Sequence, residues 1–106
     1  MRDINEADWR LWRKVANVAC ERFCEQTLAK IMETASSKED VFDRYGIVKA
    51  ILRDTDKKLE NAFSPVRRST ALQQLAYAVA EGMVSRQELA QFSDEAQQVV
   101  KLWLRE

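Results

Sequence analysis

Apolar residues recur at three- and four-residue steps over about thirty residues near the start of the chain, from Asn5 to Thr34. An α-helix turns once in about 3.6 residues, so this spacing predicts one long helix with an apolar face. The early part of the stripe comprises Trp9, Trp12, Ala16, Ala19 and Phe23. The later part comprises Cys20, Cys24, Leu28, Ile31 and Ala35. Asn5 is the predicted N-cap.

The apolar arc of this helix is wide. The later part of the stripe lies about a quarter turn from the early part, and Leu11, Val15 and Val18 add a third patch. At about 1.5 Å per residue the helix is about 45 Å long, whereas a compact domain of this size has a radius of gyration near 13 Å. We therefore expect the helix either to bend near Gln26 and Thr27 or to pack its protruding end against another chain.

The remaining apolar pattern predicts four more helices and no strand. Their predicted ranges are from after Ser37 to Ser64–Pro65, from Arg67 to Glu81, from Ser85 to Gln91, and from Asp94 to Arg105. The predicted helix ends rest on four signals: a full capping box at Ser85–Glu88, a similar pattern at Ser37–Asp40 with Asp in place of the usual Glu, an N-cap at Ser93 and a stop at Gly82. Gly46 lies inside the second helix, where it costs about 1 kcal/mol relative to alanine, and we expect it to admit a close neighbour. The chain is thus predicted to be a single all-α domain over residues 1–106, with about five helices. Two long helices pack antiparallel and three shorter ones cap them in an orthogonal or irregular bundle.

Charge and composition disfavour several function classes. The 17 basic and 17 acidic residues cancel and are mixed along the chain, whereas nucleic-acid binders concentrate positive charge. The absence of histidine removes the commonest general base and every histidine-containing metal site, so we predict no enzyme, cofactor or metal. No apolar run approaches the ~20 residues of a transmembrane helix, and Met1–Glu6 lacks the apolar region of a signal peptide. These features predict a cytoplasmic protein without a transmembrane segment.

Five side chains are predicted to form an interface with a second copy of the chain or with another protein: Trp9, Leu11, Trp12, Val15 and Trp103. Tryptophan and arginine are over-represented at the energetic centres of interfaces, and residues 9–14 contain two tryptophans among three basic residues. Two alternatives stay open for the early helix, namely an ordinary intramolecular core and a membrane surface. Nearby Asp3, Glu6 and Asp8 disfavour the membrane.

A second candidate site is the segment Arg67, Arg68, Ser69 and Thr70 at a predicted helix N-terminus. The helix dipole disfavours two cations there, so a negative group is expected nearby. It is either Asp54, Asp56 or Glu60 of the preceding helix, or an external phosphate or carboxylate.

Residues 74–91 offer a third possibility, because Gly82 separates two helices by a tight turn as in a helix-turn-helix. Arg86, Gln87 and Gln91 suit nucleic acid, but Glu81, Glu88 and Gln91 are poor residues for packing the two helices together. We regard a plain helical corner as the better interpretation.

Two further patterns have ordinary explanations. Cys20 and Cys24 share a helical face and are predicted to pack in the core, because both fall on the apolar stripe. Two thiolates do not complete a zinc site in one chain, although a two-fold dimer would supply four sulfurs. Asp54-Thr55-Asp56 has the opening spacing of a calcium loop, but Lys58 and Leu59 stand where a ligand and a glycine are required. The function predicted from the sequence is therefore association through the first helix, with nucleic-acid binding and small-anion binding as alternatives.

Overall fold

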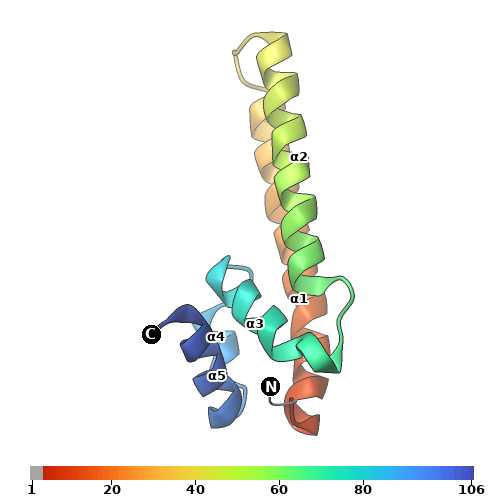
Figure 1. The fold of residues 1–106 in the computed structure, drawn as a ribbon. Coiled ribbons are helices and arrows are strands. Elements are labelled where there is room, and N and C mark those ends of the chain that lie inside the picture. The colour runs from red at the N-terminus through yellow and green to blue at the C-terminus, as the bar shows by residue number, and fades with distance from the viewer. Residues whose placement is uncertain (1–3) are drawn as a thin grey trace.

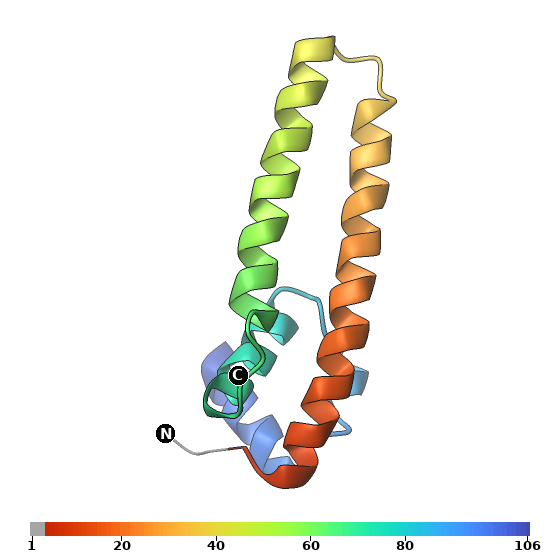
Figure 2. The ribbon, with the colours of Figure 1, turned by 90° about the vertical axis from the view of Figure 1, so that its right-hand side faces the viewer.

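The computed structural model describes residues 4–106, and these residues are entirely helical apart from their loops. The described residues do not include Met1, Arg2 and Asp3. The prediction that residues 1–6 lack the apolar region of a signal peptide therefore falls partly outside them. The helices are α1 Glu6–Ala35, α2 Val41–Phe63, the 3-10 helix η1 Arg68–Thr70, α3 Ala71–Ala80, α4 Arg86–Leu89 and α5 Asp94–Leu104. The two long helices lie side by side and antiparallel, and the short helices gather at one end of the pair (Figures 1 and 2). The predicted all-α fold is confirmed.

Helix α1 is continuous over 30 residues, so the bend considered near Gln26 and Thr27 does not occur. Asn5 is its N-cap, as predicted, and accepts a hydrogen bond of 2.8 Å from the backbone N–H of Asp8. The described residues extend over 50 Å and have a radius of gyration of 16.1 Å, above the value near 13 Å of a compact domain of this size. The far half of the α1–α2 hairpin therefore projects from the body of the molecule (Figure 2).

The start of α2 differs from its prediction. Asp40, and not Ser37, is the N-cap, because its carboxylate accepts the backbone N–H of Phe42 at 3.0 Å. Arg44 closes the connection by donating to the carbonyls of Ala35 at 2.6 Å and Glu39 at 3.0 Å. A cationic side chain thus satisfies a free carbonyl at the end of α1, which lacks a basic residue in its own last turn.

The short helices are shorter than predicted. The third begins at Ala71 after η1, and the fourth ends at Leu89 instead of Gln91. Their caps follow the prediction: Ser85 and Glu88 form a full capping box, Ser93 caps α5, and Gly82 ends α3 with a φ of +73°. Gly46, in contrast, has no neighbouring atom within 4 Å of an added Cβ, so the expected close approach is wrong.

The core lies where α1, the end of α2, α3, α4 and α5 meet. Its largest fully buried side chains are Trp12, Leu75, Met83, Val84 and Val100. Beyond Ala19, the only buried residue of α1 is Thr27, and before Ala62 the only buried residue of α2 is Thr55. The projecting part of the hairpin is therefore a two-helix layer without a core of its own. None of the described helices is long and apolar enough to span a membrane.

Candidate functional site

The distal hairpin, defined as residues 20–58, exposes large apolar side chains. Its two buried residues, Thr27 and Thr55, face each other with their hydroxyl oxygens 3.2 Å apart. This contact identifies which sides of the two helices meet, so the positions of the other side chains follow from the helical period.

Apolar residues of both helices fall on the same side of the hairpin. At about 100° per residue, Leu28 lies about 100° round α1 from Thr27, and Leu52 lies about 60° round α2 from Thr55. Because the helices are antiparallel, the same sense of rotation leads to the same side of the pair. The apolar hairpin face, as we name this side, comprises Cys24, Leu28, Ile31, Met32, Val41, Tyr45, Val48 and Leu52.

Several members of this face are well exposed. The exposed fractions are 57% for Leu28, 71% for Met32 and 67% for Tyr45. The opposite side carries the polar residues Lys30 and Glu33 of α1 and the exposed Ile47 of α2. Most of the exposed large apolar side chains of the distal hairpin therefore lie on the apolar hairpin face, which has no partner among the described residues.

The four α1 residues predicted to form an interface lie at the other end of the helix, in or against the core. Trp9, Trp12 and Val15 are buried, and Leu11 packs against the core cluster. The ring of Trp12 is fully buried and stacks on Phe63, with the ring centroids 6.0 Å apart. Burial assigns Trp9, Trp12 and Val15 to the intramolecular core, the alternative given above, and not to a surface that a partner could reach.

The predicted anion segment is divided between two places. Arg68 forms an ion pair of 2.7 Å with Glu6, and its guanidinium lies over the ring of Trp9, 5.6 Å from the centroid. The predicted protein partners Asp54, Asp56 and Glu60 do not pair with it, and Asp54 pairs instead with Lys58 at 3.2 Å. Ser69 is exposed, whereas Arg67 and Thr70 line a groove. The four residues therefore do not form one site.

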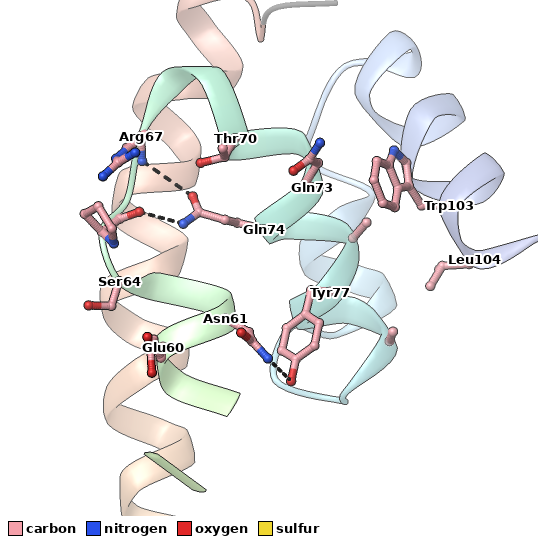
Figure 3. A pocket seen from close by; sticks show the side chains of 13 residues that line it. Glu60, Asn61, Ser64, Arg67, Thr70, Gln73, Gln74, Tyr77, Trp103 and Leu104 are labelled. Carbon is pink, nitrogen blue, oxygen red and sulfur yellow. Dashed lines mark hydrogen bonds between the residues drawn. The ribbon is translucent and has the colours of Figure 1, made fainter. Parts of the chain in front are cut away.

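That groove has a volume of about 610 Å³. Helix α3 forms its floor between the end of α2 on one side and Trp103 and Leu104 of α5 on the other (Figure 3). Trp103, the fifth predicted interface residue, is 54% exposed. The fifth helix thus contributes an aromatic wall that faces a largely polar opposite wall.

A buried amide shapes the polar end of the groove. Gln74 donates a hydrogen bond of 2.7 Å to the carbonyl of Pro65 and accepts the backbone N–H of Arg67 at 3.5 Å (Figure 3). Asn61 donates to the hydroxyl of Tyr77 at 3.4 Å. Gln74 therefore holds the loop after α2 against α3, and with it the backbone that carries Arg67.

The corner at residues 74–91 is held by ion pairs. The carboxylate of Glu88 accepts a hydrogen bond of 2.8 Å from the guanidinium of Arg22 in α1. The same guanidinium donates to the carbonyl of Met83 at 2.5 Å. Burial alone would raise the pKa of Glu88, but hydrogen bonds from Arg22 and Ser85 outweigh it and lower this pKa below its usual value. The second helix of the corner has four residues, about one turn.

Arg86, the basic residue of that short helix, forms an ion pair with Glu106. The hydrogen bond from Arg86 lowers the pKa of the Glu106 carboxyl. Two of the charged groups that would face a nucleic acid, Arg86 and Glu88, are therefore engaged within the chain.

Cys20 and Cys24 are free thiols, both half-buried. Burial raises the pKa of Cys20, and the neighbouring Cys24 adds to this effect. The thiolate, which is the nucleophile and the metal ligand, is thereby disfavoured. Across residues 4–106, no three histidine, cysteine or acidic side chains lie together as a metal site would require.

Comparison of the chain with protein-family models, curated proteins and solved structures finds no match.

Proposed function

We propose that the protein is an association module that forms a homodimer through the apolar hairpin face. The single observation that carries this proposal is the projection of two continuous helices beyond the core, with apolar side chains of both on one side. A helix pair with an apolar side is stable when another layer covers that side. A second copy supplies such a layer and completes a four-helix bundle.

The size of the face suits a dimer. A large side chain presents roughly 150–250 Å² when fully exposed, so the five most exposed members, which are 45% to 71% exposed, together present roughly 500–600 Å². A standard interface buries ~800 Å² on each partner. The half-buried members of the face and the polar residues at its edges make up the difference.

Symmetry also favours a second copy as the occupant. A two-fold axis brings the same patch of both chains together, and this is the commonest arrangement of soluble oligomers. The apolar hairpin face runs along both helices, so the faces of two copies pack against each other lengthwise and no second binding surface is needed.

Matched lysine substitutions test the proposal. Leu28→Lys and Tyr45→Lys place a charge on the apolar hairpin face, and both positions are exposed, so the fold of the single chain is retained. Ile47→Lys is the control, because Ile47 is 45% exposed on the opposite side of α2. Light scattering should give a dimer for the wild type and Ile47→Lys, and a monomer for the other two variants. Dimers of all four proteins, or monomers of all four, would overturn the proposal.

A further inference from the structure

We propose that the groove between α2, α3 and α5 binds a small organic anion with one negative charge and a planar apolar body. This site is separate from the apolar hairpin face and does not depend on self-association. Its volume of about 610 Å³ lies within the range of about 300–1,000 Å³ of small-molecule sites.

The charge of the ligand follows from two groups on the lining. Arg67 is exposed and lines the groove, and none of the ion pairs found among residues 4–106 includes its guanidinium. A guanidinium binds carboxylate, sulfonate or phosphate oxygens with paired, charge-assisted hydrogen bonds. Glu60 lines the same groove and repels a second negative charge, so a monoanion fits better than a dianion.

The apolar body follows from the opposite wall. Trp103 and Leu104 of α5 face the groove, and Tyr77 rises from its floor (Figure 3). Trp103 exposes more than half of its surface, whereas the two other tryptophans, Trp9 and Trp12, are buried. A planar ligand placed against this indole buries apolar surface on both partners and gains the offset stacking that aromatic pairs favour.

The structure also explains why the site keeps its shape without a ligand. Gln74 is buried and uses both ends of its amide to hold the loop that carries Arg67. The cation and the aromatic wall are thus attached to elements whose relative position is set by packing and hydrogen bonds, which reduces the ordering cost of binding.

Two related probes separate the contribution of charge from that of stacking. Anilinonaphthalene sulfonate carries one negative charge, and N-phenylnaphthylamine has the same aromatic body without it. Binding is followed by nitrogen–proton correlation spectra, in which the three tryptophans give three indole signals. Both probes should shift the signal of Trp103, identified by its loss in Trp103→Phe, and leave those of the buried Trp9 and Trp12 in place.

Substitutions at the two charges should act in opposite directions. Arg67→Gln should weaken binding of the sulfonate about 1.5- to fivefold, the range of an exposed ion pair, and Glu60→Gln should strengthen it about twofold. Neither change should alter binding of the neutral probe. Trp103→Ala should weaken binding of both probes, followed for this variant by probe fluorescence, and Leu102→Ala, the exposed neighbouring residue, should weaken neither. The proposal is overturned if the Trp103 signal does not respond, if the sulfonate binds Arg67→Gln as it binds the wild type, or if Leu102→Ala has the same effect as Trp103→Ala.

Discussion

The carboxylate of Asp8 in the first turn of α1 accepts two hydrogen bonds from Ser93, the N-cap of α5. The donors are the backbone N–H at 2.9 Å and the hydroxyl at 2.5 Å. The hydroxyl oxygen of Ser93 in turn accepts the backbone N–H of Ala96 at 3.1 Å, as an N-cap does. Asn5 also donates to Asp8, at 2.9 Å. One buried carboxylate thus links the N-termini of two helices that are far apart in the sequence.

Replacement of Asp8 should destabilise the fold. Asp8→Ala removes a charged acceptor from partly buried donors, and a hydrogen bond to a charged group contributes about 1.5–3 kcal/mol. We expect the free energy of unfolding, measured by urea titration, to fall by about 2–3 kcal/mol. The control is Asp94→Ala, which removes an exposed carboxylate from the first turn of α5 and should cost no more than about 1 kcal/mol. Equal losses for the two variants would show that the contact with Ser93 contributes little.

The ion pair between Glu88 and Arg22 should make stability depend on pH in the acid range. Because the folded-state pKa of Glu88 is lowered, the stability it contributes is complete above its unfolded pKa of about 4.3. That contribution is lost as the pH falls through the lower folded value. Glu88→Gln should therefore be less stable than the wild type at neutral pH, by about 1 kcal/mol for a partly exposed pair. Urea titrations over a pH series should show this difference narrowing below about pH 4. A difference that is constant with pH would contradict this account, because the charge of Glu88 would then contribute nothing to stability.

The two glycines should respond in opposite directions to alanine. Gly46→Ala should raise the free energy of unfolding by about 0.5–1 kcal/mol, because the position is helical and an added Cβ meets no atom within 4 Å. Gly82→Ala should lower it by about 1–2 kcal/mol, because Gly82 has a φ of +73°. Denaturant titration of both variants checks the pair, and a loss of stability in Gly46→Ala would contradict the packing described here.

The loss of stability on replacing a tryptophan should follow how deeply that tryptophan is buried. Trp12→Ala removes a fully buried ring that stacks on Phe63, and it should cost about 3–5 kcal/mol. Trp103→Ala removes a ring that is more than half exposed, and it should cost less than about 1 kcal/mol. Thermal unfolding distinguishes the two variants. Similar, small losses in both would mean that α1 is not anchored by its Trp12 side chain.

The helical fold was predictable because local signals determine it. Asn5, Ser85, Ser93 and Gly82 mark helix ends through contacts with their own neighbours in the chain, so their roles can be inferred from sequence spacing. The N-cap of α2 was misplaced because Ser37 and Asp40 both have side chains that cap helices. Asp40 is the N-cap in a loop that Arg44 of α2 closes by donating to the carbonyl of Ala35 in α1, and sequence spacing does not reveal such a contact between helices.

The candidate sites were less predictable because they depend on contacts across the fold. The apolar stripe of α1 is continuous in the sequence, and nothing local distinguishes Trp12, which the short helices cover, from Met32, which they do not reach. The partner of Arg68 is Glu6, far away in the chain, although nearer acidic residues were available. Trp103 is predicted from the sequence as an interface residue, but its place opposite Arg67 follows only from the packing of α5 on α3.

The molar mass of the wild-type chain in solution tests the central claim most directly. Sedimentation equilibrium over a series of micromolar concentrations should give twice the chain mass of 12.3 kDa at the upper end, with dissociation on dilution. The apolar hairpin face would then be covered in the species that predominates. A mass of 12.3 kDa at every concentration would contradict the account, because the projecting hairpin would then be stable with its apolar side in water.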